Sequence, residues 1–517
     1  MIFAAMVMLA GLVSFGNGLQ AGEWADELRV TWDPVEQYDC GMVVAPDNTV
    51  YAFWPEAYMK QNSLYLIKST DFGGNWSSPS MILKPDTIHS FKMAADAAGL
   101  HLTFLQHDTI GDTRLFYTKS TDNGATFSTP VQLGTLTDVW QTRLDSGDGK
   151  LLVYAKDGTA GHYILVSNDG GATWTEKPFT VSANIWNPAI VLKNNAIHVA
   201  FGGFANTPIA YSRSVDDGAT WQSPVDVSSG AGPHSQCPTL AVENDTIHVA
   251  WEDDRSGSFN VMYTRSTDDG ITWSKDLQIN DTYYGARVKL LTDSEGVHIT
   301  WCQYHGMSGW PSNWGSDDYG IIWYKFSGDS GATWSSEFRV SQNESIPTMQ
   351  LPDEGANYVE FGKYQGGLCA CWLDKRDGNV DFYMRNRFSF LTADKYTISA
   401  MKGGVSNFAL NAGMENAGRN YIILASLTGT QPGTPLPGGL ATIPINWDGF
   451  TNLVFLLTNT FNFTDFMGTL DGSGEGTAQL NLPALPPDFV GLTMYFAYAS
   501  NNPWDVASNA IGIEIGL

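Results

Sequence analysis

The sequence predicts an all-β protein, a β-propeller followed by a β-sandwich. Three observations lead to this prediction. An eight-residue phrase recurs six times at intervals of 47 to 61 residues, short apolar strands surround each copy, and the composition changes after Phe390. Repeats of this length with four short strands are typical of propeller blades, which must stack because one blade cannot bury both of its faces.

The repeated phrase reads Ser214-Val-Asp-Asp-Gly-Ala-Thr-Trp221 in its fourth copy. Asp and Ser side chains can hydrogen-bond nearby backbone amides at a turn. The glycine can adopt a positive φ without steric cost, and the closing aromatic ring can pack under the turn. We therefore predict a rigid hairpin between the third and fourth strands of each repeat. The aspartates of the six copies are given this structural role: Asp71, Asp122, Asp169, Asp216, Asp268 and Asp329.

A seventh repeat lacks the phrase. The stretch Leu368–Gly378 resembles Val249–Gly257 of the fifth repeat, and only three strands are expected there. The apolar run Leu28–Trp32 precedes the first repeat and has no partner within it. It would supply the missing outer strand and close the ring, which removes an open sheet edge. We predict seven blades over residues 25–392, with six blades as the alternative.

The tail, residues 394–517, contains neither His nor Cys and has turns rich in Gly and Pro. Between the turns lie β-like runs such as Tyr421–Ser426, Leu453–Leu457 and Leu492–Tyr498. These segments favour a small antiparallel β-sandwich. Its expected role is accessory, in attachment, spacing or glycan contact, and the alternative is a plain stabilising domain.

The chain begins with an apolar run over residues 1–15 that is too short for a confident membrane span. We interpret residues 1–21 as a secretory signal peptide cleaved after Ala21, although no basic residue precedes the run. The mature protein is then expected to be secreted, in the periplasm or at the extracellular surface. No second stretch of the sequence is long enough to span a membrane.

The net charge of −26 disfavours nucleic acid as a partner, because a surface this negative repels phosphates. Acidic polymers are also disfavoured unless basic residues gather in one local site. The five cysteines form no CxxC pair, so a zinc cluster is not expected. We predict no metal site and no cofactor, while the Asp-rich turns leave room for a structural calcium ion. The oligomeric state stays open.

A ligand site is expected at the rim opposite the repeated phrases, where the innermost strands begin and loops converge. Aromatic faces suit sugar rings, and arginine forks suit carboxylates. The ligand-binding candidates are Arg143, Arg287, Trp140 and Trp186, with His305, Trp310 and Trp314 from a long loop. The catalytic candidates are His89 and His234 for proton transfer and Tyr284 as a nucleophile, each against a purely structural interpretation.

Other polar residues are assigned to packing. His198 and His248 occupy matching positions in two repeats, which favours a role inside the sheets. The pairs Asp253–Arg255 and Asp374–Arg376 are expected to stabilise turns, and the rival interpretation is that both arginines face the axial opening.

The repeated phrase resembles the Asp-box, or bacterial neuraminidase repeat, of sialidases and related secreted bacterial propeller proteins. The resemblance covers residues 27–390 and implies the propeller fold, whereas the box occurs in glycosidases, lyases and binding proteins alike. Sialidases carry a Phe/Tyr-Arg-Ile-Pro motif in the first blade, and its arginine begins a triad that grips the substrate carboxylate. Here Arg29 is followed by Val30 and Thr31, so the motif is missing.

Three functions follow from these observations. The first is a secreted propeller that binds or processes glycans or exopolysaccharide at the loop face opposite the Asp-boxes. The second is a sialidase-like glycoside hydrolase with a rearranged carboxylate grip. The third is a non-catalytic adhesion protein of the extracellular matrix or cell surface. Convergence of the Arg, His and Tyr candidates in one pocket would favour ligand chemistry, and dispersal would favour adhesion.

Overall fold

The computed structural model describes the greater part of the chain. The described residues are 24, 27–31, 40–55, 63–70, 73, 76–84, 88–107, 112–158, 161–180, 185–203, 207–229, 235–243, 245–281, 284–293, 296–305, 319–341, 346–347, 359–364, 367–374, 376, 380–388, 390–412, 416–430 and 433–516. For residues 89, 304, 305, 319, 346, 347, 364 and 388 the description covers the backbone alone. The predicted signal peptide, residues 1–21, lies outside these ranges.

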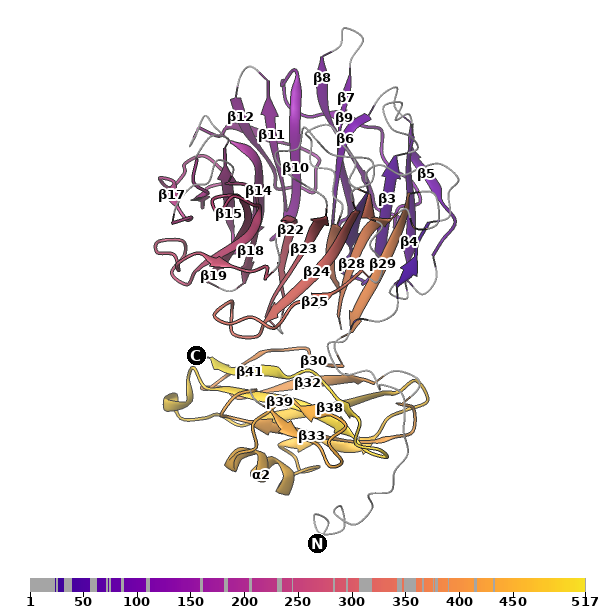
Figure 1. The fold of residues 1–517 in the computed structure, drawn as a ribbon, viewed down its shortest axis with the longest axis vertical. Coiled ribbons are helices and arrows are strands. Elements are labelled where there is room, and N and C mark those ends of the chain that lie inside the picture. The colour runs from indigo at the N-terminus through magenta and orange to yellow at the C-terminus, as the bar shows by residue number, and fades with distance from the viewer. Residues whose placement is uncertain are drawn as a thin grey trace. The chain divides into compact units, whose positions relative to one another are not determined.

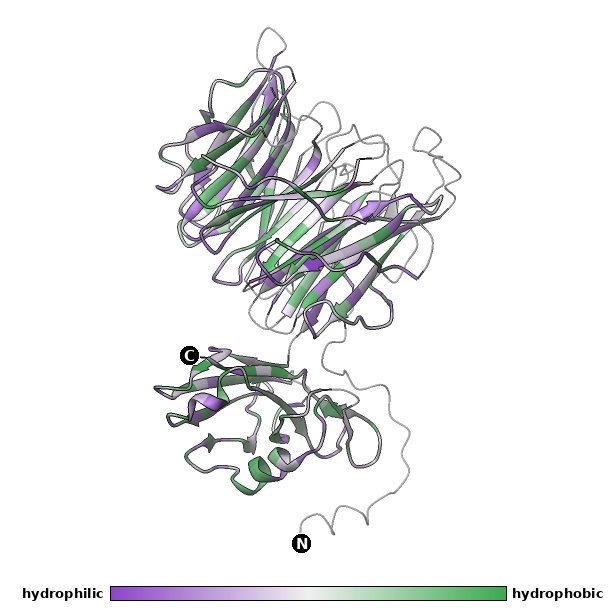
Figure 2. Cartoon of the chain, turned by 90° about the vertical axis from the view of Figure 1, so that its left-hand side faces the viewer, coloured by the Kyte–Doolittle hydropathy of each residue, from purple (hydrophilic) through white to green (hydrophobic). Residues whose placement is uncertain are grey.

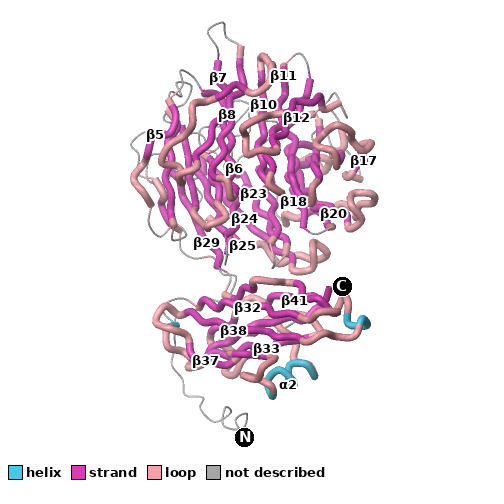
Figure 3. Tube along the Cα trace, turned by 180° about the vertical axis from the view of Figure 1, so that it is seen from behind, coloured by secondary structure: helices cyan, strands magenta, loops and turns pink. Residues whose placement is uncertain are grey.

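The chain divides into two compact units. The first contains Asp26–Tyr364 with Cys369–Asn386, and the second contains Arg387–Leu517. Both are dominated by strands, and helix α2 (Gly449–Leu456) belongs to the second unit (Figure 3). The prediction of an all-β fold is confirmed.

Four-stranded sheets follow one another along the first unit (Figure 1). The first three sheets contain β2 (Gly41–Val44), β3 (Val50–Pro55), β4 (Leu64–Ser69) and β5 (Ser80–Leu83); β6 (Ile88–Asp96), β7 (Gly99–His107), β8 (Thr113–Ser120) and β9 (Val131–Gln132); and β10 (Val139–Gly147), β11 (Lys150–Asp157), β12 (Gly161–Ser167) and β13 (Thr175–Pro178).

The next four sheets continue the same order. They contain β14 (Trp186–Lys193), β15 (Ala196–Gly202), β16 (Ala210–Ser214) and β17 (Val225–Asp226); β18 (Ser235–Glu243), β19 (Thr246–Asp253), β20 (Asn260–Ser266) and β21 (Leu277–Gln278); β22 (Gly285–Thr292), β23 (Val297–His305), β24 (Tyr319–Ser327) and β25 (Phe338–Arg339), with β26 (Ile346–Pro347) also paired to β24; and β27 (Val359–Tyr364), β28 (Gly367–Asp374), β29 (Asp381–Phe388) and β1 (Leu28–Arg29).

The sheets pack face to face through apolar cores. One core joins Leu105 and Tyr117 of the second sheet to Leu151 and Val153 of the third. Equivalent cores follow between the later neighbours, so the sheets between them bury apolar side chains on both faces. Figure 2 shows hydrophobic residues, in green, along the strands of these sheets. Burial from both sides stabilises the stack through the hydrophobic effect.

The first strands of the sheets lie next to one another in chain order. Each first strand contacts the first strand of the next sheet, in the order β2, β6, β10, β14, β18, β22 and β27. Strand β27 in turn contacts β2. A series that returns to its start is consistent with a β-propeller, in which the first strand of each sheet lines the axis.

The repeated phrase forms the same hydrogen-bonded turn in the described copies. In the fourth copy, the Ser214 hydroxyl donates to Asp216 Oδ1 over 2.8 Å. Asp216 also accepts the backbone N–H of Thr220 over 2.8 Å and its hydroxyl over 2.7 Å. The Thr220 hydroxyl is the main reason that the pKa of Asp216 is lowered to about 2. The same contacts recur around Asp122, Asp169, Asp268 and Asp329, while Asp71 lies outside the described residues.

The glycine of the phrase also packs against the preceding sheet. Gly171 has φ = 85°, and a Cβ built on it would lie 2.0 Å from the hydroxyl oxygen of Tyr117. Both the positive φ and this close approach require glycine at this position. The phrase therefore fixes its own hairpin and also the contact between neighbouring sheets.

The start of the chain completes the last sheet. Leu28 and Arg29 of β1 pair antiparallel with Met384 and Tyr383 of β29. The Arg29 guanidinium lies 2.5 Å from the fully buried carboxylate of Asp381, which also accepts the Thr31 hydroxyl over 3.2 Å. The outer edge of β29 is thus covered, as the run Leu28–Trp32 had suggested.

Arg29→Ala should loosen this closing strand. It removes the contact between this guanidinium and the buried Asp381 carboxylate, and we expect the free energy of unfolding to fall by about 2–3 kcal/mol. Urea denaturation gives the loss, and hydrogen exchange should show faster exchange of the β29 amides. Unchanged exchange in β29 would contradict a closing role for β1.

Buried histidine–tyrosine pairs recur in the sheets. His198 Nδ1 lies 2.6 Å from the Tyr211 hydroxyl, and His248 Nδ1 lies 2.7 Å from the Tyr263 hydroxyl. Burial lowers the pKa of His198 and of His248 to about 4. The prediction that these two histidines serve the packing of the sheets is confirmed by these contacts.

These two histidines should make stability depend on pH. In the unfolded chain a histidine takes up a proton near pH 6.5, whereas the folded protein resists protonation down to about pH 4. Stability is therefore complete above pH 6.5 and falls as the pH drops toward 4, by about 3 kcal/mol for each histidine. In urea denaturation at several pH values, His248→Leu should show a shallower loss than the wild type. Equal slopes would contradict this origin.

The second unit contains two larger sheets. The first sheet is formed by β30 (Leu391–Ala393), β32 (Gly404–Asn411), β38 (Glu475–Leu482) and β36 (Phe463–Thr464). The second is formed by β31 (Thr397–Ser399), β41 (Ile511–Gly516), β39 (Thr493–Ser500), β33 (Asn420–Ser426) and β37 (Met467–Thr469), with β40 (Val506–Ala507) on β39. The second unit also contains a short antiparallel pair, β34 (Thr434–Pro435) and β35 (Thr442–Ile443), and the 3-10 turn η3 (Pro487–Phe489).

One apolar core combines side chains of both larger sheets. Phe408 and Leu480 come from the first sheet, and Ile423, Phe496 and Ile513 come from the second. Helix α2 begins at a capping box in which Asp448 accepts the Thr451 N–H over 2.9 Å. The segment Leu453–Leu457, which resembled a strand in the sequence, is therefore mainly helical, because the cap at Asp448 fixes a helix start.

Candidate functional site

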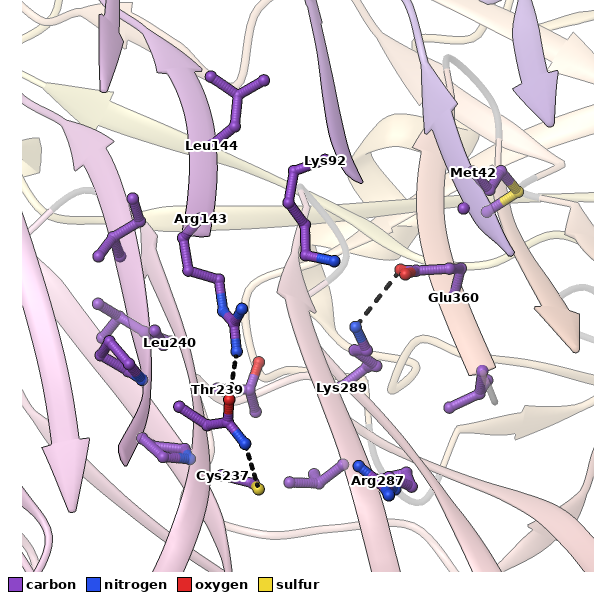
Figure 4. A pocket seen from close by; sticks show the side chains of 18 of the residues that line it. Met42, Lys92, Arg143, Leu144, Cys237, Thr239, Leu240, Arg287, Lys289 and Glu360 are labelled. Carbon is purple, nitrogen blue, oxygen red and sulfur yellow. Dashed lines mark hydrogen bonds and ion pairs between the residues drawn. The ribbon is translucent and has the colours of Figure 1, made fainter. Parts of the chain in front are cut away.

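A cavity of about 310 Å³ lies where the first strands of the first unit meet. Its wall includes residues from all seven first strands, β2, β6, β10, β14, β18, β22 and β27. Figure 4 shows side chains from these strands directed into the same space. We refer to it as the axial cavity.

Four basic side chains line the axial cavity. They are Lys92 on β6, Arg143 on β10, and Arg287 and Lys289 on β22. Glu252 on β19 and Glu360 on β27 are the acidic residues of the lining. A chain with a net charge of −26 thus gathers more positive than negative groups at this one place.

The sheet register explains why three of these cations meet. Lys92, Arg143 and Lys289 pair with Thr103, Tyr154 and Thr300, which are equivalent positions in their sheets. Side chains at equivalent positions of first strands point toward the axis at the same depth. Two of the other sheets place smaller residues there, Ala189 on β14 and Thr239 on β18, and so leave room between the cations.

Bulges place a second set of side chains in the cavity. The register shifts between Trp186 and Ala189, between Gln236 and Thr239, and between Ala286 and Lys289. The residues inside these bulges have positive φ, at 43° for Asn187, 49° for Cys237 and 56° for Arg287. A bulge re-aims side chains, and all three residues line the cavity.

A hydrogen-bonded chain orients Arg143. Its Nη2 donates to Asn187 Oδ1 over 3.0 Å, and its Nη1 donates to the carbonyl of Thr142 over 2.9 Å. Asn187 in turn donates from Nδ2 to the sulfur of Cys237 over 3.7 Å (Figure 4). Burial raises the pKa of Cys237 to about 12, so this thiol adds no charge to the wall.

The two carboxylates have different surroundings. Glu360 lies 3.4 Å from the ammonium of Lys289, and both side chains are partly exposed to the cavity. Glu252 is 4% exposed and accepts the backbone N–H of Arg287 over 2.6 Å. Burial raises the pKa of Glu252 above its usual range, although Arg287 opposes this effect. As the pH falls through this raised pKa, the cavity therefore becomes still more positive.

The structure places the predicted site residues in different locations. Arg143 and Arg287 come together in the axial cavity. Trp140 is 49% exposed, and the ring centroid of Trp186 lies 5.1 Å from Lys156 Nζ; neither is part of the cavity wall. Tyr284 has φ = 62° directly before β22 and is also outside the wall.

The remaining candidates cannot be placed in this way. His89 and His305 are described by their backbones alone, and His234, Trp310 and Trp314 lie outside the described residues. Their roles in ligand binding or catalysis stay predictions, as do those of Trp140, Trp186 and Tyr284.

The sequence reasoning did not select Lys92, Lys289, Glu252 or Glu360. A signal was present: Lys92 and Lys289 each precede the repeated histidines His101 and His298 by nine residues. Arg143 has the same offset from Leu152, which replaces the histidine in the third sheet. Aligning the repeats on their second strands would have brought these cations together.

The turn-stabilising pairs are confirmed. The Arg255 guanidinium lies 2.6 Å from the buried carboxylate of Asp253, and Arg376 contacts Asp374 in the same manner. Among the described residues, no group of three or more His, Cys, Asp or Glu side chains is arranged to hold a metal ion. The helices of the described part are too short or too polar to cross a bilayer.

Comparisons with known proteins give similarity at the level of solved structures. No protein-family model matches the sequence, and no curated protein matches it. The chain is similar to the phage phi92 endosialidase, with 12% identity and a TM-score of 0.41 over 70% of this chain and 69% of that one. It is also similar to the Trypanosoma rangeli sialidase in complex with the inhibitor DANA, with 12% identity and a TM-score of 0.37 over 93% and 89%.

A third similar structure is a variant of the NanB sialidase from Streptococcus pneumoniae, with 13% identity and a TM-score of 0.36 over 72% of this chain and 70% of that one. At identities below 25% and TM-scores below 0.5, these similarities carry no argument about activity or blade number. The function has to be argued from the axial cavity itself.

Proposed function

We propose that the protein is a secreted, seven-bladed β-propeller protein that binds acidic saccharides in its axial cavity. In this proposal the propeller covers residues 25–392, and residues 394–517 form an accessory β-sandwich. The closed series of first strands and the pairing of β1 with β29 support seven blades. The shared core of the two sheets in the second unit supports the sandwich.

The observation that carries the proposal is the group of four cations in one small cavity. Lys92, Arg143, Arg287 and Lys289 face two carboxylates in a chain that is otherwise strongly negative. A recess in which one sign of charge predominates attracts ligands of the opposite sign, and an arginine fork matches a carboxylate. The volume of about 310 Å³ lies at the small end of ligand sites, which suits one sugar ring with its acid group.

The register supports entry from the face opposite the repeated phrases. Arg143 pairs with Tyr154 in the middle of β11, whereas Leu151 at the start of β11 pairs with Ser167, the first residue of a repeated phrase. The bulge residues lie still further from the phrases, at the beginnings of the first strands. Loops at that face would contact the rest of a glycan.

The test is a panel of saccharides assayed for both binding and turnover. It contains N-acetylneuraminate, D-glucuronate and sialosides, acidic polysaccharides, and the neutral sugars galactose and N-acetylglucosamine as controls. We expect acidic members to bind, with an affinity that falls as salt is raised because the contacts are ionic. Equal binding of neutral and acidic members, or no binding of any member, would refute the proposal.

A second candidate function, non-catalytic adhesion at a cell surface or matrix, is favoured by apolar groups on the second unit. Leu456, the last residue of α2, is 78% exposed, and Phe461, shortly after the helix, is 80% exposed. Exposed apolar side chains of this size are typical of contact surfaces. Adhesion that is lost in the double variant Leu456→Ser, Phe461→Ser and unaffected by acidic saccharides would favour this alternative.

A further inference from the structure

We infer that Glu252 couples ligand binding to the uptake of a proton, so that the axial cavity holds acidic saccharides more tightly in mildly acidic solution than at alkaline pH. This inference rests on the proposed function and adds a regulatory property to the same site. It concerns one residue that the sequence did not single out.

Glu252 is held firmly in the wall of the cavity. Its Oε1 accepts the backbone N–H of Arg287 over 2.6 Å, and its Oε2 lies 3.5 Å from the Nε2 donor of Gln236. These contacts come from β22 on one side and β18 on the other. With 4% of its surface exposed, the carboxyl group cannot turn into bulk water when a ligand arrives.

Few charges are available to compensate Glu252. On β22 the facing charged group is Arg287, and on β18 the facing titratable group is the Cys237 thiol, which is neutral. On β20 the residue paired with Glu252 is Val261, which is apolar. The neighbours on β19 itself, Trp251 and Asp253, point to the other face of the sheet, where Arg255 binds Asp253.

A bound carboxylate would therefore meet a like charge in the wall. Figure 4 shows Arg287 near Cys237 in the same cavity that Arg143 enters. An anion seated on these cations brings its negative charge close to Glu252, and two carboxylates in a buried site favour protonation of one of them. Protonation of Glu252 also removes a negative charge that partly offsets the positive charge of Arg287 in the cavity. Binding and proton uptake are thus favourable together.

The experiment is calorimetric titration of the whole protein with N-acetylneuraminate and D-glucuronate between pH 5 and 8. Both sugar acids are fully ionised over this range, so a pH effect must come from the protein. We expect Kd to rise by up to tenfold per pH unit above the pKa of Glu252. Titration in two buffers with different ionisation enthalpies should show about one proton taken up per ligand near neutral pH.

Two variants separate the proton effect from charge alone. Glu252→Gln keeps the shape and the acceptor for Arg287, and we expect it to bind at least tenfold more tightly than the wild type at pH 8, with a flat pH profile. Glu360→Gln removes the other carboxylate of the cavity. It should tighten binding at every pH and keep the wild-type slope.

The outcomes distinguish this inference from the proposed function. Binding that is independent of pH, without proton uptake, would overturn the role of Glu252 and leave the saccharide site intact. No binding of either sugar acid at any pH, together with no binding of any other acidic member of the saccharide panel, would overturn both. If Glu252→Gln does not fold, as circular dichroism would show, proton uptake by the wild type decides the question.

Discussion

Arg143→Ala should weaken binding of an acidic saccharide by about 30- to 150-fold. Arg143 is oriented by Asn187 and Thr142 and points into a small cavity, where a charge-assisted contact is only partly screened by water. Loss of hydrogen bonds to a charged group costs about 2–3 kcal/mol, which corresponds to this change in Kd. Titration calorimetry with the tightest acidic member of the panel measures it.

Two further variants make this result specific. Arg143→Lys keeps the charge but removes the fork, so we expect an intermediate loss. Arg265→Ala is the matched control, because Arg265 contacts the carbonyl of Asp329 at the end that carries the repeated phrases. It should leave Kd within about twofold of the wild type. Equal losses in Arg143→Ala and Arg265→Ala would point to a general change in charge and contradict the axial site.

Asp253→Ala should lower the free energy of unfolding by about 3–5 kcal/mol. Its carboxylate is buried and accepts hydrogen bonds from Ser235, Trp251 and Arg255, with distances of 2.8, 3.0 and 2.7 Å. Removing the carboxylate takes a buried acceptor away from three donors, although the Arg255 guanidinium keeps its contact with Asp276 over 2.7 Å. The loss is measured by urea denaturation at neutral pH.

A surface aspartate in the preceding sheet supplies the control. Asp226 is exposed at the edge strand β17, and Asp226→Ala should change the free energy of unfolding by less than about 0.5 kcal/mol. A loss below about 1 kcal/mol in Asp253→Ala would mean that water replaces the missing carboxylate. In that case the Asp253–Arg255 pair would not be what holds this turn.

The fold of the first unit was largely predictable because each copy of the repeated phrase determines its turn through contacts between residues close in the sequence. The Ser, Asp, Gly and Thr of the repeated phrase determine a turn through contacts within eight residues, so the hairpin can be recognised from one copy. The pairing of β1 with β29 joins residues about 350 positions apart, and it was expected only because an unpaired strand and an incomplete repeat stood at opposite ends. Helix α2 was missed because Leu453–Leu457 has the composition of a buried strand.

The axial cavity was harder to predict from the sequence than the fold. Arg143 and Arg287 were selected because they stand near the starts of innermost strands, and both line the cavity. Lys92 and Lys289 stand at the same position of their strands as Arg143, and their convergence with Arg287 depends on strand register and on bulges at Asn187, Cys237 and Arg287. Such bulges have no clear sequence signature, because a single extra residue in one strand is visible only when its partner is known.

The position of β1 has a consequence for how the protein is made. A strand near the beginning of the chain forms the outermost strand of the final sheet. During synthesis on the ribosome, β1 therefore stays unpaired until residues 381–388 of β29 have been made. Until this pairing forms, the edge of β29 can instead pair with β1 of a neighbouring molecule, because that strand has the identical sequence. Exchange of this terminal segment between copies is therefore the assembly error to which this architecture is most exposed.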